Sequence, residues 1–116
     1  MTITPAQVES RLYELSIDLD DAHEELVNDE SRFHTLTADY EIGLAKSRIK
    51  YAHGDMKMTV SQREDLALVE NEAVYRALTE SEAKVKASRA NVNRLRVQVD
   101  IARSIAVSVR ASMEIA

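Results

Sequence analysis

Hydrophobic positions along the chain follow a seven-residue repeat in two long segments. The first segment has two series, Leu12, Leu19, Leu26, Phe33 and Tyr40 with Val8, Leu15, Ala22 and Leu36 between them. The second segment has Leu78, Val85, Val92, Val99, Ala106 and Met113 with Val74, Ser81, Ser88, Leu95, Ala102 and Val109. Two apolar positions in every seven residues are typical of long helices that pack as a coiled coil. The pattern therefore predicts an all-α fold built from two long helices.

Signals for the ends of the first helix are present in the sequence. Thr4 can cap a helix that begins at Pro5, and Gln7 can complete a capping box with Thr4. Gly54 can adopt the left-handed conformation that ends a helix. These signals predict a first helix over about residues 5–52.

A second start signal lies at Thr59 or Ser61, and no Gly or Pro follows it. We therefore expect a turn over about residues 53–60 and one continuous second helix over about residues 61–113. The two helices would form an antiparallel hairpin, and residues 1–116 would form a single domain.

The second helix is rich in small residues, and several aliphatic residues lie off both repeats. The alanines that line one half of this helix are Ala73, Ala77, Ala83, Ala87 and Ala90. Their small size would let a neighbouring helix approach closely. The aliphatic residues outside the repeats are Ile17, Val27, Ile42, Ile49, Ile101 and Ile105. This surplus apolar surface predicts a homo-oligomer, and the alternative is a lone hairpin with scattered exposed aliphatics.

Composition excludes several classes of protein. The chain has 116 residues, with 2 Gly, 1 Pro, 4% aromatic residues and no Cys or Trp. Sheets need more turn and aromatic residues, and disulfides, thiol nucleophiles, cysteine zinc sites and iron–sulfur clusters need cysteine. No apolar stretch approaches the roughly 18 residues of a membrane span, and the N-terminus lacks a signal-sequence pattern. We therefore expect a cytoplasmic protein with no membrane contact.

Charge is divided unevenly between the two segments. Residues 9–30 contain nine acids and one base, whereas residues 84–110 contain seven bases and one acid. In a hairpin these segments would lie side by side, so the charges can pair and set the register of the helices. Alternatively, outward-facing bases can remain free to bind phosphate groups.

Residues for catalysis or metal binding are not grouped in the sequence. His23 and His34 are three turns apart and His53 falls in the turn, so the three imidazoles would not meet at one metal. The carboxylates lie on charged helix faces without an apolar pocket to shift their pKa. We expect no enzymatic activity, no metal and no cofactor.

A basic cluster surrounds the predicted turn. Lys46, Arg48, Lys50 and Lys57 lie there with Tyr51. Cations interleaved with an aromatic ring suit single-stranded nucleic acid, because phosphates meet the charges and a base can stack on the ring. The alternative is an ordinary helix C-terminus, where the helix dipole favours bases.

The segment from Lys46 to Gly54 resembles the Lys-x-Arg-aliphatic-x-Tyr-x-x-Gly pattern of the UvsY-type recombination mediators of phages. More loosely, the resemblance covers most of the chain and includes Tyr40 and the pair Arg103-Ser104. This chain departs from the family at Lys50, where the family has an acid. The resemblance implies that Lys46 and Arg48 bind single-stranded DNA.

The same resemblance implies a phage-encoded accessory protein of recombination or replication, located in the host cytoplasm. Such a protein would act as a closed oligomer that loads a RecA-like recombinase onto DNA covered by single-strand-binding protein. The alternative is a protein-binding or structural coiled coil, either a virion component or an inhibitor or adaptor of a host protein. A secreted helical hairpin of the kind exported by mycobacteria is a third reading, but the Trp-x-Gly turn of that class is missing.

Overall fold

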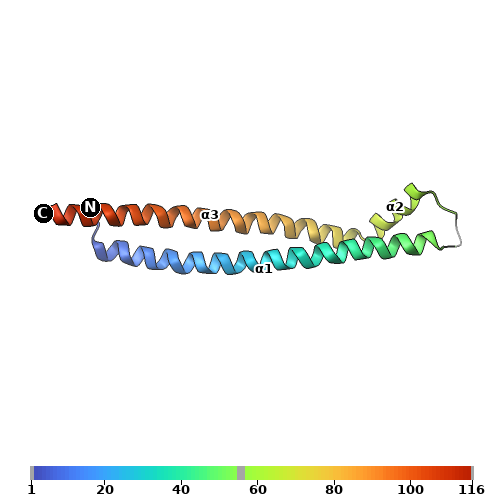
Figure 1. Cartoon of the computed structure of the whole chain (residues 1–116), viewed down its shortest axis with the longest axis horizontal. Coiled ribbons are helices and arrows are strands. Elements are labelled where there is room, and N and C mark those ends of the chain that lie inside the picture. The colour runs from blue at the N-terminus through green and yellow to red at the C-terminus, as the bar shows by residue number, and fades with distance from the viewer. Residues whose placement is uncertain (1, 55–56, 116) are drawn as a thin grey trace. The chain divides into compact units, whose positions relative to one another are not determined.

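The computed structural model describes residues 2–54 and 57–115, and it is helical along nearly all of them. Helix α1 spans Pro5–Ala52, α2 spans Val60–Glu70 and α3 spans Glu72–Ile115. No strand occurs in these two described ranges. The predicted all-α fold is confirmed, and α1 has the bounds expected for the first helix (Figure 1).

Both predicted N-terminal caps are formed. The backbone N–H of Thr4 donates to Gln7 Oε1 at 3.0 Å, and the N–H of Gln7 donates to Thr4 Oγ1 at 3.3 Å. Thr59 and Gln62 make the same reciprocal pair at 3.0 and 3.1 Å, so Thr59 caps α2. Each capping box satisfies two N–H groups that would otherwise lack a partner at the start of a helix.

The end of α1 differs from the prediction, because Gly54 does not adopt a left-handed conformation. The backbone N–H of His53 still donates to the carbonyl of Ile49 at 3.2 Å, so the helical bonding continues to the last turn. A Cβ at Gly54 would meet only the Lys50 and Tyr51 carbonyl oxygens, at ordinary contact distances of 3.7 and 3.8 Å. The backbone here does not require glycine.

The second helix is interrupted at Asn71, where the sequence predicts continuity. The residue has φ −103° and ψ 17°, and its backbone N–H is shared between the Ala67 and Leu68 carbonyls at 3.2 Å. Its side-chain Nδ2 also donates to the Ala67 carbonyl, at 2.8 Å. Asparagine breaks the helix because its amide competes for backbone partners.

The contacts within the chain define two units. Unit 1 comprises residues 1–27 and 86–116, and unit 2 comprises residues 28–85. In unit 1 the first part of α1 runs antiparallel to the last part of α3 (Figure 1). Its core is Leu15, Ala22, Val92, Leu95, Val99 and Ala102, with Leu12, Leu19 and Leu26 packed against it. These are the repeat positions read from the sequence, so the heptad prediction is confirmed there.

Unit 2 contains the rest of α1, all of α2 and the start of α3, and its buried positions are more polar. Its described buried residues are Asp29, Ser47, Ala67, Ser81 and Val85. The larger apolar side chains of unit 2 are partly buried or exposed. The rings of Tyr40 and Tyr75 meet with centroids 5.5 Å apart. Close helix approach in unit 2 therefore depends on small and hydrogen-bonding residues.

Two details of the predicted second helix are wrong. Met113 is 61% exposed and does not continue the packed repeat. The alanines Ala83, Ala87 and Ala90 are exposed rather than packed against α1. They lie outside the repeat of buried positions, because residues two or five places from a buried position turn to a different helix face.

Candidate nucleic-acid interface at the end of α1

The five residues singled out from the sequence all belong to unit 2. Lys46, Arg48, Lys50 and Tyr51 lie in the last two turns of α1, and Lys57 lies between α1 and α2. All four cations are exposed, whereas Tyr51 is half-buried. Lys46, Arg48, Lys50 and Tyr51 therefore share one end of α1 but have different surroundings, and Lys57 lies outside the helix.

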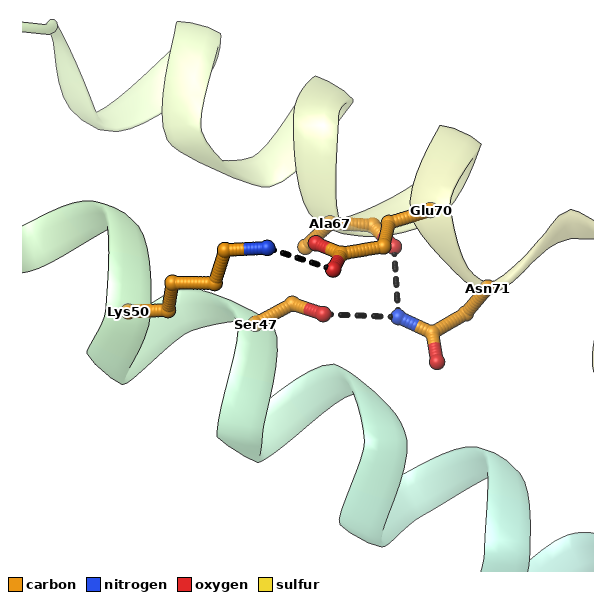
Figure 2. A network of polar contacts seen from close by, with 5 residues as sticks. All are labelled: Ser47, Lys50, Ala67, Glu70 and Asn71. Carbon is orange, nitrogen blue, oxygen red and sulfur yellow. Dashed lines mark hydrogen bonds and ion pairs between the residues drawn. The ribbon is translucent and has the colours of Figure 1, made fainter.

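Lys50 is joined to an acid on another helix. Its Nζ lies 2.7 Å from Oε1 of Glu70, near the end of α2 (Figure 2). The same Nζ lies 5.1 Å from the centre of the Tyr51 ring, within reach of a cation–π interaction. Glu70 is not recognisable from the sequence as a partner of Lys50, because it lies twenty residues away and only the return of the chain through α2 brings the two together.

This pair has the pKa shifts of an ion pair. The hydrogen bond from Lys50, followed by that from Tyr51, lowers the pKa of the Glu70 carboxyl. The hydrogen bond to Glu70 and its charge raise the pKa of Lys50. Both groups are therefore charged at neutral pH, and a phosphate that binds Lys50 would compete with Glu70.

Lys46 and Arg48 have a different environment. Because they are two residues apart on a helix, their side chains point about 160° apart around the axis. Ser47 between them is buried, so the two cations flank the packed face of α1 on opposite sides. Neither makes an ion pair with a described residue, and the exposed Ile49 lies on the outer face between them. One anionic strand can contact both cations only by crossing that outer face.

A polar network fixes this part of α1 in unit 2. Asn71 Nδ2 donates to Ser47 Oγ at 2.9 Å as well as to the Ala67 carbonyl (Figure 2). A Cβ at Gly43 would overlap Oδ1 of Asn71, so only glycine leaves room for this side chain. The interruptions in the hydrophobic repeat at Gly43 and Ser47 were the available signal for a polar contact here.

Bases of α3 provide a second cationic surface. Arg96, Arg103 and Arg110 recur every seven residues, are exposed, and make no ion pair within the described parts of unit 1. Arg94 donates to Oδ1 of Asn91 at 2.8 Å. In unit 2, Lys84 Nζ lies 3.2 Å from the buried Asp29 carboxylate, which is the kind of acid–base pair that the charge pattern predicts. Some bases of residues 84–110 therefore pair with an acid, as Lys84 does, and others, such as Arg96, make no ion pair within the described parts of unit 1.

No three metal-ligating side chains among residues 2–54 and 57–115 are placed to hold a metal ion. No helix in the described part of the chain is long and apolar enough to cross a membrane.

Comparison with protein-family models, with curated proteins and with solved structures gave no match to this chain.

Proposed function

We propose that this protein is a non-enzymatic accessory factor of phage recombination or replication that binds single-stranded DNA at the end of α1. The observation that carries the proposal is the exposure of Lys46 and Arg48 without an acid partner, beside a cation that is already paired. Exposed, unpaired cations gain most from phosphate, because no existing ion pair has to be broken. Lys57 is exposed between α1 and α2 and adds a third cation.

Within this proposal the five residues have unequal roles. Lys46 and Arg48 contact phosphates from the two sides of α1. Lys50 is held by Glu70 and therefore contributes less to binding, while it keeps Tyr51 beside it. The partly exposed Tyr51 ring offers a surface on which one base can stack. A RecA-like recombinase and single-strand-binding protein are the partners that the resemblance to UvsY-type mediators implies, and they remain part of the proposal.

The test is binding of labelled single-stranded DNA at two salt concentrations. We expect the Lys46→Ala/Arg48→Ala variant to bind more weakly and to show a smaller loss of affinity with salt, because fewer counterions are released. A matched control is Arg11→Ala/Arg76→Ala, which removes the same charge from two exposed arginines already paired with Glu14 and Glu72. Equal affinity and equal salt dependence of the first variant and wild type would reject the proposal.

A second candidate function is protein binding by a helical module without a nucleic-acid role. The observation that favours it is the row of exposed apolar side chains on α3, including Val97 and Ile101. If the Lys46/Arg48 variant binds DNA as wild type does, this second function becomes the better account.

A further inference from the structure

The junction between α2 and α3 in unit 2 lacks backbone bonds that a continuous helix would make. Among the described residues, the N–H of Glu72 does not bond to the Leu68 carbonyl, and the N–H of Val74 does not bond to the Glu70 carbonyl. Regular helical bonding precedes and follows this turn. The interruption is therefore confined to a few bonds, which can form without unwinding either helix.

The sequence of the junction permits a continuous helix. No Gly or Pro occurs between residues 58 and 116. Asparagine is a weaker helix former than alanine, but it keeps its backbone N–H and is far more favourable inside a helix than proline. Asn91 and Asn93 lie inside α3 without interrupting it. The break at Asn71 therefore needs a cause beyond its residue type.

Two residues of α1 supply that cause. The Asn71 amide donates to Ser47 Oγ at 2.9 Å and to the Ala67 carbonyl at 2.8 Å (Figure 2), and its Oδ1 fills the space beside Gly43. The side-chain position that reaches Ser47 is thus the one that competes with the backbone for the Ala67 carbonyl. Without Ser47, the amide can turn away and leave this carbonyl to the regular helical bond from the Asn71 N–H.

The seven-residue repeat runs through the junction without a change of register. Val60, Ala67 and Val74 are seven residues apart, and Asn71 and Leu78 occupy the other repeat position. Ala67 is fully buried, and Val74 and Leu78 are partly buried, whereas Val60 is 62% exposed. Because seven residues are nearly two turns, a continuous helix places Val60 on the same face as Ala67. A straight α2–α3 segment therefore keeps one packing face and adds an apolar residue to it.

We propose that the α2–α3 junction is a two-state conformational switch controlled by α1. In the bent state, Asn71 bonds to Ser47, and α2 and α3 are separate helices. In the straight state the Asn71 amide leaves Ser47, the N–H groups of Glu72 and Val74 bond to the carbonyls four residues earlier, and residues 60–115 form one helix. The two states exchange hydrogen bonds of similar kind, so the loss of one contact with α1 shifts their populations. The switch does not require DNA binding, so its test and the test of the proposed function can fail separately.

Amide hydrogen exchange of Glu72 and Val74 reports the state of the junction, because these N–H groups gain a helical acceptor only in the straight state. We expect fast exchange of both amides in wild type. Exchange should be about tenfold slower in Ser47→Ala, which keeps Asn71 but removes its acceptor on α1. Asn71→Ala provides the reference for the straight state. Ser81→Ala is the matched control, because Ser81 is also a buried serine of unit 2, and it should exchange as wild type does.

Two results of this experiment would overturn the proposal. If the amides exchange as fast in a helical Ser47→Ala variant as in wild type, the contact with α1 does not control the junction. If they exchange slowly in wild type, the straight state already dominates and α1 does not hold the bend. Helical circular dichroism of each variant shows that fast exchange does not come from unfolding.

A distance between spin labels provides a second measurement, since the chain has no native cysteine. The labels are attached at Ser61→Cys and Thr79→Cys, two exposed positions eighteen residues apart, which is five turns or about 27 Å along a continuous helix. We expect Ser47→Ala to move the distance from its wild-type value to that of Asn71→Ala. Gly43→Ala should do the same, because its Cβ displaces the Asn71 amide from the other side. A wild-type distance in both variants, or equal distances in wild type and Asn71→Ala, would overturn the proposal.

Discussion

Asn71 fills the space that a side chain at Gly43 would occupy. A Cβ at Gly43 would overlap Oδ1 of Asn71 and lie 3.2 Å from its Cγ. The amide cannot move aside freely, because its Nδ2 donates to both Ser47 and the Ala67 carbonyl. The same asparagine interrupts the helix between α2 and α3. Asn71 therefore both excludes a side chain at Gly43 in α1 and interrupts the helix between α2 and α3.

Gly43→Ala should therefore destabilise the protein although alanine favours a helix. Alanine gains about 1 kcal/mol over glycine in helix propensity. Moving Asn71 sacrifices two hydrogen bonds at about 1 kcal/mol each and leaves the buried Ser47 hydroxyl without this donor, while the Ala67 carbonyl keeps the backbone N–H of Asn71. We expect a net loss of about 1–2 kcal/mol in the free energy of unfolding in urea. Adding Asn71→Ala to Gly43→Ala should recover part of this loss, and a purely additive double variant would contradict the steric explanation.

We expect the ion pair of Lys84 and Asp29 to favour one register of the two helices rather than to increase the free energy of unfolding. Lys84→Met leaves the buried Asp29 carboxylate without its lysine, and we expect a loss of about 1–3 kcal/mol. Changing both residues, as Asp29→Leu/Lys84→Met, completes the apolar repeat and should match or exceed wild-type stability. Urea unfolding of the two variants measures the difference. A double variant less stable than Lys84→Met alone would contradict this account.

The Lys50 and Glu70 pair predicts a small dependence of stability on pH. The pKa of Glu70 is lowered by Lys50, so its contribution is present above the usual glutamate pKa and disappears as pH falls through the lowered value. The pKa of Lys50 is raised by Glu70, so its contribution is present below the usual lysine pKa and disappears as pH rises through the raised value. The Tm difference between wild type and Glu70→Gln should therefore be largest near neutral pH and shrink toward both extremes.

That difference should also be modest, because both side chains are substantially exposed. Glu64→Gln is a suitable control, since Glu64 is an exposed acid on the same helix without an ion pair among the described residues. A Tm difference for Glu70→Gln that does not change with pH would reject the ion-pair explanation.

Tyr51→Ala distinguishes base stacking from local packing. If a base stacks on the ring, DNA affinity should fall by about 1–3 kcal/mol for each contacting subunit. Tyr51→Phe should retain that stacking while it removes the hydroxyl that helps to lower the pKa of Glu70. Fluorescence anisotropy with labelled single-stranded DNA measures both variants. Wild-type affinity in Tyr51→Ala would assign the ring to packing alone.

The exposed arginines of α3 offer an alternative DNA surface. Arg96→Gln/Arg103→Gln should leave unfolding free energy nearly unchanged, because neither residue makes an ion pair within the described parts of unit 1. We also expect wild-type DNA affinity if residues 46–57 form the binding site. A loss of affinity larger than that of Lys46→Ala/Arg48→Ala would move the DNA surface to α3.

The sequence by itself determined the helical fold, the caps and the packed repeat. The caps depend on hydrogen bonds between residues close in sequence, such as Thr4 and Gln7. The packed repeat depends on the regular spacing of apolar side chains along one helix. The heptad positions also identified most of the buried core of unit 1. Asp29 and Gly43 stand at positions of the repeat where an apolar residue is expected, and the sequence alone gives no reason for these two interruptions.

Only the tertiary structure decided which distant residues meet at those interruptions. Asn71 contacts Gly43 and Ser47, Lys84 reaches Asp29, and Glu70 pairs with Lys50, each across at least twenty positions in sequence. Such pairings depend on the register in which one segment returns along another, and a seven-residue repeat permits several registers. The basic cluster was visible in the sequence, but its division into paired and unpaired cations required the fold.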